Sequence, residues 1–456
     1  MVSGLFAPIF TTDELTAATG DTAWLTAMLD AEAALAAAQA DLGIVPADAA
    51  EVIGAVCRSA TFDIDQLGHD ARGAGNPVIP LVAALTAAVG PEAGRWVHWG
   101  ATSQDILDTA AMLVAERSTA VIAGHLDDLG DACASLADTH RRTLMVGRTL
   151  LQAALPITFG LKAASWLAGA DAAAAALHHA RSALAVQLGG AAGTLASLGA
   201  EGPAVVARFA VHVGLAQPLV PWHTARQRVS GLAAALGTVA GTAAKISTDV
   251  GLLAQSEVAE AAEPAGAGRG GSSTLPHKRN PVGAAAVHAA ARRALALVPV
   301  LQGSLLAEHE RALGAWHAEW EPLSQLLALA GGAAARSAET VAGLEVHPGA
   351  MAANLSATAG VLLAERVTLE LAGHTDRGQA RRAVTAAVEQ TEGGHSFAEA
   401  LLAQPAVSDH LSAERLATLL DPAGYLGATD IWIDRAVTAH RSAPGRHRPP
   451  TGEAPS

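Results

Sequence analysis

Apolar residues recur along most of the chain at the three- and four-residue spacing of α-helices. The first stripe follows Asp21, which stands where an N-cap belongs, and ends before Gly43; its members are Leu25, Met28, Leu29 and Leu35. A second stripe has heptad spacing and comprises Ile122, Leu126, Leu129, Cys133 and Leu136. Further helical segments rich in alanine and leucine fill about 152–200, 229–262, 282–314 and 322–345. No run alternates with period two for long enough to build a sheet, so the pattern predicts an all-α protein.

Turn-forming residues divide this helical chain into three parts and a tail. We predict an N-terminal helical domain over residues 1–108, a central bundle of long helices over 109–350 and a smaller helical domain over 351–441. The proline-rich residues 442–456 are predicted to be disordered. Segments that are apolar nearly all round must be buried on several sides, which indicates that the central bundle assembles with other copies of itself.

Composition and charge narrow the class of protein. Of the 456 residues, 51% are hydrophobic and 16% are charged, which excludes an intrinsically disordered chain. The formal net charge is −14 and no stripe of lysine or arginine is present, so we expect no nucleic-acid partner. The two cysteines, Cys57 and Cys133, lie in apolar helical stretches, which argues against a disulfide framework and fits a reducing cytosol. Because there is no basic leader and no uninterrupted apolar run of about 18 residues, we expect a cytoplasmic protein without a membrane segment.

One segment between helices breaks the pattern. Residues 263–281 read EPAGAGRGGSSTLPHKRNP, with four glycines followed by two serines, Lys278 and Asn280. The glycines formally match a dinucleotide fingerprint, but no strand precedes them, so that match is weak. A flexible surface linker is the simpler alternative, although a linker has no need of the closely spaced Lys278 and Asn280. We predict a mobile functional loop, because glycine hinges beside reactive polar groups suit a closing lid.

Three segments in order resemble the signature regions of the fumarase/aspartase superfamily. They are HWGATSQDILDTA (98–110), GRTLLQAALPITFG (147–160) and GSSTLPHKRNP (271–281), the last with Leu275 in a position that is usually methionine. The resemblance covers essentially the whole chain. It implies an all-α homotetramer whose central helices form a bundle. It also implies active sites that are each built from three subunits and need no metal or organic cofactor.

The resemblance also assigns residues to roles. Ser273 corresponds to the general base that removes a proton next to a substrate carboxylate, and Lys278 is the second catalytic residue. The predicted substrate-binding residues are His98, Thr102, Ser103, Gln104, Arg148, Thr149, Gln152, Arg226 and Asn280. A proton beside a carboxylate is barely acidic, so fixed positive charge and hydrogen-bond donors must stabilise the anionic intermediate. Serine is a poor base in water, which is why the loop must close and exclude solvent.

Departures from the family pattern restrict the chemistry. Leu150 stands where fumarases and related lyases carry a histidine, and Ala285 stands where many carry the glutamate that orients it. Gly75 and Asn76 replace a histidine–aspartate pair of adenylosuccinate lyases. A positioned acid supplies about 10²–10⁴-fold in rate, so hydroxide and amines leave badly without one. A carboxylate, whose conjugate acid has a pKa of about 4, leaves unprotonated.

An expelled carboxylate points to the opening or closing of a lactone. The branch of the family that this pattern resembles is 3-carboxy-cis,cis-muconate cycloisomerase, and the likeness extends to PWHTARQR (221–228) and EHERALGAWHAEW (308–320). It implies reversible formation of 4-carboxymuconolactone in protocatechuate degradation by the β-ketoadipate route. The substrate is a small tricarboxylate, so cationic groups should line the site. Gln227 departs from the aspartate usual in that branch, which leaves the support of the adjacent arginines open.

Several alternatives stay open. His98 could be a structural histidine, Arg226 could form an ion pair between helices, and Trp316 and Trp320 suit a core better than a substrate platform. An eliminating lyase with another weakly basic leaving group, such as nitrite from nitrosuccinate, fits the missing acid equally well. A catalytically silent structural relative is a third possibility, against which the intact loop residues argue. The exact dicarboxylate or tricarboxylate substrate and the group that replaces the missing histidine are not determined.

Overall fold

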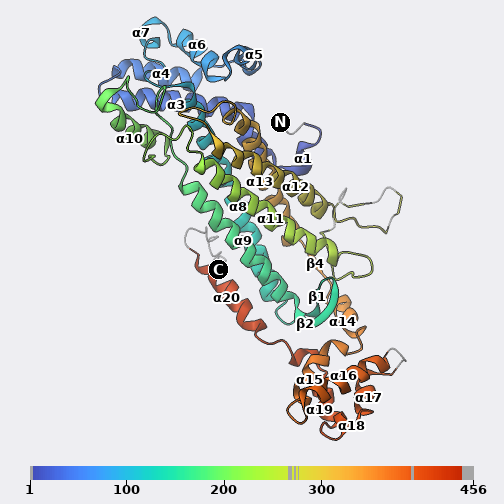
Figure 1. The fold of residues 1–456 in the computed structure, drawn as a ribbon. Coiled ribbons are helices and arrows are strands. Elements are labelled where there is room, and N and C mark those ends of the chain that lie inside the picture. The colour runs from blue at the N-terminus through green and yellow to red at the C-terminus, as the bar shows by residue number, and fades with distance from the viewer. Residues whose placement is uncertain are drawn as a thin grey trace, which may run out of the picture. The chain divides into compact units, whose positions relative to one another are not determined.

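The chain divides into two compact units, each built from segments that are distant in sequence. The computed structural model describes residues 4–264, 266, 270–271, 274–275, 277–391 and 395–443 (Figure 1). Unit 1 comprises Met1–Leu126, Ala172–Lys245 and Ala285–Ser337, and unit 2 comprises Asp127–Asp171, Ile246–Ala284 and Ala338–Ser456. The predicted three-part division into consecutive domains stays a prediction. Nearly all of the predicted tail lies outside the described residues.

Helices make up almost all of the regular structure. Five long ones contribute residues to both units: α8 (Ser103–Thr139), α9 (Phe159–Ser182), α11 (Gln227–Leu253), α12 (Val282–Gly303) and α13 (Trp320–Ala342). Unit 1 also holds α1 (Ala7–Phe10), α2 (Asp13–Thr19), α3 (Asp21–Ala40), α4 (Ala47–Ser59), α5 (Ile64–Ala74), α6 (Val78–Val89), α7 (Pro91–Gly94) and α10 (Gly202–Val213). Unit 2 also holds α14 (Pro348–Ser356), α15 (Ala364–Leu371), α16 (Arg377–Thr391), α17 (Phe397–Leu402), α18 (Pro405–Ser408), α19 (Ala413–Leu419) and α20 (Thr429–Ser442). Short 3-10 turns are η1 (Gly199–Glu201), η2 (Ser304–Leu306), η3 (His317–Glu319), η4 (Val361–Leu363) and η5 (Pro422–Gly424).

The all-α class is confirmed, but two small antiparallel sheets correct the expectation of no strands. In unit 2, β1 (Leu144–Thr149) pairs with β2 (Gln152–Thr158), and β3 (Ala261–Ala262) pairs with β4 (Glu345–Val346). The helix predicted from residue 152 therefore begins only at Phe159. Pro156 explains the difference, because proline breaks a helix interior and is tolerated in a two-stranded edge. Gly147 sits at a bulge in β1, where a Cβ would lie 2.7 Å from the carbonyl oxygen of Leu155.

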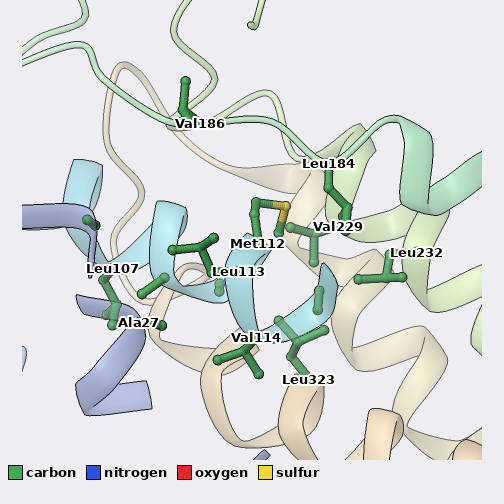
Figure 2. Close-up of a cluster of buried hydrophobic side chains, with 14 of the residues drawn as sticks. Ala27, Leu107, Met112, Leu113, Val114, Leu184, Val186, Val229, Leu232 and Leu323 are labelled. Carbon is green, nitrogen blue, oxygen red and sulfur yellow. The ribbon is translucent and has the colours of Figure 1, made fainter. Parts of the chain in front are cut away.

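Unit 1 has one large apolar core. Side chains from the first turns of α8, from α11 and α13, and from the irregular segment after α9 meet there (Figure 2). The figure labels Leu107, Met112, Leu113, Val114, Leu184, Val186, Val229, Leu232 and Leu323 among them. The first predicted stripe contributes Met28, Leu29 and Leu35 to the same core. Its helix starts one residue earlier than predicted, with Gly20 rather than Asp21 at the N-cap.

Unit 2 has two separate cores. One joins the second half of α8 to α9, α11, α13 and α20, and buries Leu129 and Cys133 of the predicted heptad stripe. The other is formed by α15 to α19 alone, from Val367 to Leu419. The small C-terminal helices therefore fold around apolar side chains of their own.

Two helical stretches, Gln227–Leu253 and Val282–Leu306, are long and apolar enough to cross a membrane by length and composition. Both supply buried side chains to the core of unit 1, among them Leu232, Leu236, Val287 and Leu301. Because core helices of soluble proteins meet the same criterion, these stretches are weak evidence for a membrane segment.

Candidate active site

The first signature segment forms the N-terminus of α8, the longest helix. Thr102 directly precedes the helix and Ser103 opens it, and both are half-buried. The first N–H groups of a helix have no partner within the helix and carry a partial positive charge. This partial charge favours an anion at the start of α8. Binding of a substrate carboxylate by Thr102 and Ser103 stays a prediction.

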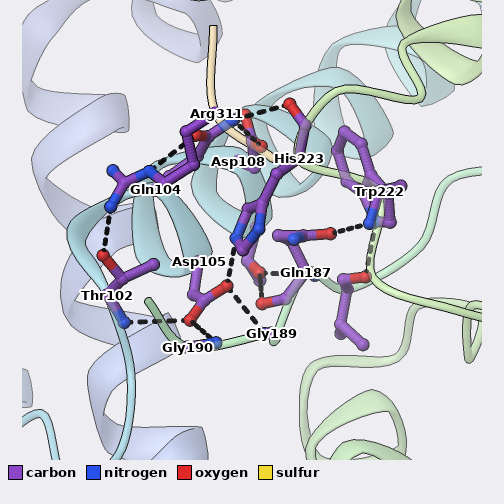
Figure 3. A network of polar contacts seen from close by, with 12 residues as sticks. Thr102, Gln104, Asp105, Asp108, Gln187, Gly189, Gly190, Trp222, His223 and Arg311 are labelled. Carbon is purple, nitrogen blue, oxygen red and sulfur yellow. Dashed lines mark hydrogen bonds and ion pairs between the residues drawn. The ribbon is translucent and has the colours of Figure 1, made fainter. Parts of the chain in front are cut away.

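Asp105, in the first turn of α8, ties this helix end to two other segments of unit 1 (Figure 3). Its fully buried carboxylate accepts hydrogen bonds from the backbone N–H groups of Thr102, Gly189 and Gly190, each at 2.9 Å. The fourth contact is His223, whose Nε2 lies 2.7 Å from Asp105 Oδ1. One carboxylate thus fixes the start of α8 against the glycine turn and the His223 segment.

Arg311 is a site residue that the sequence did not single out. It comes from the segment between α12 and α13, and its Nη1 donates to Thr102 Oγ1 at 2.7 Å (Figure 3). Its Nε donates to Gln104 Oε1 at 3.3 Å. The guanidinium therefore stands beside the N-terminus of α8 and adds a fixed positive charge there. The segment EHERALGAWHAEW (308–320) belongs to the resemblance described above, but no local feature of it distinguishes Arg311 from the neighbouring charged residues.

Arg226 is buried between carboxylates, which matches the ion-pair alternative. Its guanidinium is 2% exposed and bonds Asp108 at 2.8 and 3.0 Å and Glu319 Oε1 at 2.9 Å, with a further contact to Glu319 Oε2. Burial opposes the charged form, but the Asp108 and Glu319 carboxylates outweigh it and raise the pKa of Arg226. The Trp222 ring lies under the guanidinium at 4.8 Å. Direct contact of Arg226 with substrate stays a prediction, and it would require these contacts to open.

Gln104 is similarly engaged. Its buried amide donates to Asp108 Oδ2 at 3.1 Å and to the carbonyl of His223 at 2.9 Å. Gln104 bonds both Arg311 and Asp108 and so fixes these two side chains relative to each other. Its contact with substrate stays a prediction.

The arginines around Gln227 do not depend on that residue. Gln227 is exposed, and Asp108 and Glu319 supply the carboxylates for Arg226. Arg228 instead donates to the carbonyl of Ala183. Burial and, to a smaller extent, the positive charge of Arg226 lower the pKa of Arg228.

His98 makes a structural contact, as one of its two alternatives predicted. His98 has a left-handed φ of 59°, which is uncommon outside glycine and is often found at functional sites. Its Nδ1 lies 2.6 Å from Glu32 Oε1, in a contact between unit 1 segments 66 residues apart. Burial would lower the pKa of His98, but the Glu32 carboxylate reverses this and raises it. The structural contact is observed, and a role in substrate binding stays a prediction.

The tryptophans of the same segment have the core role that their spacing favoured. Trp316 is buried and donates to Asp108 Oδ1 at 3.0 Å. Trp320 packs edge-on against it at 4.9 Å. Gly75 and Asn76 also act structurally: Gly75 ends α5 with a φ of 78°, and Asn76 Oδ1 accepts the N–H of Val78 to cap α6.

The second signature segment forms the β1–β2 hairpin of unit 2. Arg148 makes a two-pronged ion pair with the fully buried Glu260, each N–O distance being 2.8 Å. Hydrogen bonding to Glu260 raises the pKa of Arg148. Asn354 also donates to Glu260 Oε1, at 2.9 Å. The hairpin is therefore held against the segment that directly precedes residues 263–281.

The turn of this hairpin carries strained residues. Leu150 and Leu151 have left-handed φ values of 50° and 64°, and Leu150 is 97% exposed. Thr149 and Gln152 face each other across the turn and are exposed. A left-handed conformation in two successive leucines is costly, and such strain concentrates at functional sites.

The loop that carries the third segment is fixed at its base. The N–H of Asn280 and its Nδ2 both donate to the carbonyl of Gly270, at 2.8 and 3.2 Å. Glu263 accepts the N–H groups of Gly283 and Ala284 and so caps α12. Arg279 pairs with Glu345 on β4 at 2.9 Å. Lys278 is exposed, and Ser273, the predicted base, lies outside the described residues.

The structure thus brings the predicted residues together in two groups. Unit 1 gathers Thr102, Ser103 and Gln104 with Arg226 and the additional Arg311. Unit 2 holds Arg148, Thr149 and Gln152 on the hairpin and Lys278 and Asn280 on the loop. Within the described part of the chain, no three His, Cys, Asp or Glu side chains gather as a metal site would require. The expectation of a metal-free enzyme stays a prediction.

Comparison with known proteins gives consistent family assignments. A lyase family model matches residues 9–296, and the model of the adenylosuccinate lyase C-terminus matches residues 360–436. A 3-carboxy-cis,cis-muconate cycloisomerase of Bradyrhizobium diazoefficiens is 46% identical over 96% of this chain and 98% of its own. A nitrosuccinate lyase of Streptomyces davaonensis is also 46% identical, over 97% of both chains. The crystal structure of the 3-carboxy-cis,cis-muconate lactonizing enzyme from Pseudomonas putida superposes with a TM-score of 0.90 at 39% identity, covering 96% of this chain and 99% of that one.

Proposed function

The chain belongs to this lyase family, the fumarase/aspartase superfamily that its three motifs resemble, and on that basis we propose that it is a 3-carboxy-cis,cis-muconate cycloisomerase. In the forward direction a substrate carboxylate oxygen adds to a carbon of a conjugated double bond. The neighbouring carbon then takes up a proton, which gives 4-carboxymuconolactone. In the reverse direction the base removes that proton and the carboxylate leaves. Relatives with this name match nearly the whole chain.

The residue at position 150 is the observation that carries this proposal. Leucine cannot donate a proton, and Leu150 stands at the strained hairpin turn where related lyases place their acid. A missing acid costs about 10²–10⁴-fold when the leaving group must be protonated. A carboxylate, with a conjugate-acid pKa of about 4, departs as the anion. The reaction proposed is therefore one that the remaining residues can perform.

The roles of the remaining residues follow from the charge that develops on the substrate. Ser273 is the proposed base, and Lys278 and Asn280 hold the carboxylate next to the carbon that loses its proton. The N-terminus of α8 at Thr102 and Ser103 receives a second carboxylate. Arg311 supplies fixed positive charge that needs no rearrangement as the intermediate forms. Arg148 is a proposed substrate contact whose charge is already balanced by Glu260, so its role requires that pair to open.

We further propose a cytoplasmic homotetramer whose active sites combine the three signature segments from three subunits. The wide apolar faces of the long helices support this assembly. The chain's own side chains supply all of the proposed chemistry, so neither a metal ion nor an organic cofactor is required.

The experiment that tests the proposed function is an ultraviolet assay of the purified, chelator-treated protein with 3-carboxy-cis,cis-muconate. The conjugated diene absorbs and the lactone does not, so rapid loss of absorbance with lactone as product is expected. A Ser273→Ala variant should assemble to the same oligomeric mass in solution as the wild type. It should lose most of the turnover of 3-carboxy-cis,cis-muconate. Unchanged absorbance with an intact assembly would reject the cycloisomerase.

Nitrosuccinate lyase is the second candidate, because one relative with that name is as similar as the first cycloisomerase. Nitrite is a weakly basic leaving group, so the absence of an acid at Leu150 fits it equally well. Release of nitrite and fumarate from nitrosuccinate, with no change in carboxymuconate, would establish this alternative. Inactivity toward both substrates would favour a catalytically silent relative.

A further inference from the structure

Arg279 stands in the chain between Lys278 and Asn280, the two residues that are proposed to hold a substrate carboxylate. Its guanidinium makes three hydrogen bonds within unit 2. Two go to the carboxylate of Glu345 on β4, from Nη1 to Oε2 and from Nη2 to Oε1, each at 2.9 Å. The third goes from Nη2 to the backbone carbonyl of Glu263, at 2.8 Å. One side chain therefore joins the end of the loop to its beginning and to β4.

Both partners of Arg279 belong to the small β3–β4 sheet or directly follow it. Glu345 pairs with Ala262 on β3, and Glu263 is the next residue after that strand. The buried carboxylate of Glu263 accepts two backbone N–H groups at the start of α12, at 2.9 and 2.7 Å. The sheet is thus anchored to a long helix, and Arg279 attaches the loop end to this frame.

The backbone on both sides of Lys278 is bonded within the loop itself. The N–H of Lys278 donates to the carbonyl of Leu275 at 3.0 Å, and the N–H of Asn280 donates to that of Gly270 at 2.8 Å. A Cβ on Gly270 would lie 2.6 Å from the carbonyl oxygen of Asn280, so the two strands of the loop cross closely there. These bonds shape the loop end but do not tie it to β4. The pair between Arg279 and Glu345 makes that connection.

We propose that Arg279 is a positioning residue, which holds Lys278 and Asn280 where they can bind a substrate carboxylate. The inference rests on the proposed function for its ligand. Arginine suits this role because its planar fork meets a carboxylate at two points and keeps a further N–H for the carbonyl of Glu263. A binding group contributes fully only when it is held in place, and a displacement of about 1 Å can cost about 10²-fold in rate.

Two variants remove the pair from opposite ends. Arg279→Gln and Glu345→Gln each keep a polar side chain, and the two positions lie 66 residues apart in the chain. With the substrate that the wild type turns over, we expect each variant to lower kcat/KM by about 10-fold, mostly through a higher KM. The double variant should lose no more than either single variant, because both changes break the same contact. Arg279→Lys keeps the charge without the fork and should lose less.

Stability separates this role from a merely structural one. The side chains of Arg279 and Glu345 are 51% and 38% exposed, and exposed ion pairs contribute little to stability. The unfolding temperature of each variant should therefore stay within about 2 °C of the wild type. The matched control is the pair of Arg415, which is 48% exposed, with Glu370. Arg415→Gln should leave kcat/KM unchanged.

Amide hydrogen exchange gives a second readout that needs no turnover. A peptide that spans residues 277–284 should exchange faster in Arg279→Gln and in Glu345→Gln than in the wild type. Unchanged exchange, or a loss of activity in Arg279→Gln without one in Glu345→Gln, would overturn the proposal. A wild type that is inactive toward both candidate substrates would reject the proposed function, and faster exchange in both variants would still support the positioning role.

Discussion

Single residues decide which leaving groups this site can expel and where its charges are held. In the proposed mechanism Leu150 leaves the reaction without a proton donor. Arg311 holds a positive charge beside Thr102, whereas the charge of Arg148 is balanced by Glu260. The roles of Leu150 and Lys278 could be proposed from the sequence, because they stand inside recognisable motifs. An ion pair could also be proposed for Arg226, but its carboxylate partners could not be identified, and neither could the role of Arg311, since the partners are about 90 to 210 residues away in the chain.

The His98–Glu32 pair gives a prediction for pH. The pKa of His98 is raised in the folded protein, so the pair stabilises the fold fully below the ordinary histidine pKa of about 6.5. That contribution disappears as the pH rises through the folded-state pKa. Glu32→Gln should therefore reduce the free energy of unfolding more at about pH 5.5 than at about pH 9, as measured by urea denaturation.

A matched control for this prediction is Asp41→Asn at the more exposed His212–Asp41 contact of 3.0 Å. Solvent screens that contact, so its effect should be at most about 1 kcal/mol at either pH. An equal effect of Glu32→Gln at both pH values would mean that His98 is not charged by its partner.

At the scale of elements, α8 is the part that the sequence predicted best and the β1–β2 hairpin the part it missed. The heptad stripe of α8 is long and regular, and four of its five residues are fully buried. The hairpin is short and rich in leucine, and periodicity cannot separate such a run from a helix. Pro156 and Gly147 were the available signals, and the close strand approach that explains Gly147 depends on tertiary structure.

The start of α8 depends on one carboxylate, which gives a prediction for this element. Asp105→Asn leaves a single acceptor oxygen where Asp105 now receives three backbone N–H groups and His223. We expect a loss of at least about 3 kcal/mol in the free energy of unfolding, because buried donors lose their charged acceptor. The measurement is urea denaturation monitored by circular dichroism. Asp128→Asn on the exposed face of the same helix should change stability by at most about 0.5 kcal/mol, and equal effects of the two variants would contradict the role of Asp105.

At the scale of the whole molecule, the charge of the chain and the charge of its proposed substrate oppose each other. The net charge is −14, and the proposed substrate is a trianion. Long-range attraction therefore cannot come from the net charge, and the local field of the α8 N-terminus and Arg311 must dominate beside Thr102. The fold class and the family could be predicted from the sequence, because three motifs recur in order on a helical chain.

The central claim is that this enzyme lacks a general acid and so expels only groups that leave as anions. The most direct measurement compares product formation from L-malate with turnover of 3-carboxy-cis,cis-muconate and nitrosuccinate by the same metal-free preparation. We expect rapid turnover of one of the two substrates with weakly basic leaving groups, and no detectable fumarate from malate, whose hydroxide needs a proton. Fumarate formation from malate at a comparable rate would show that another residue replaces the missing histidine at Leu150, and would contradict the claim.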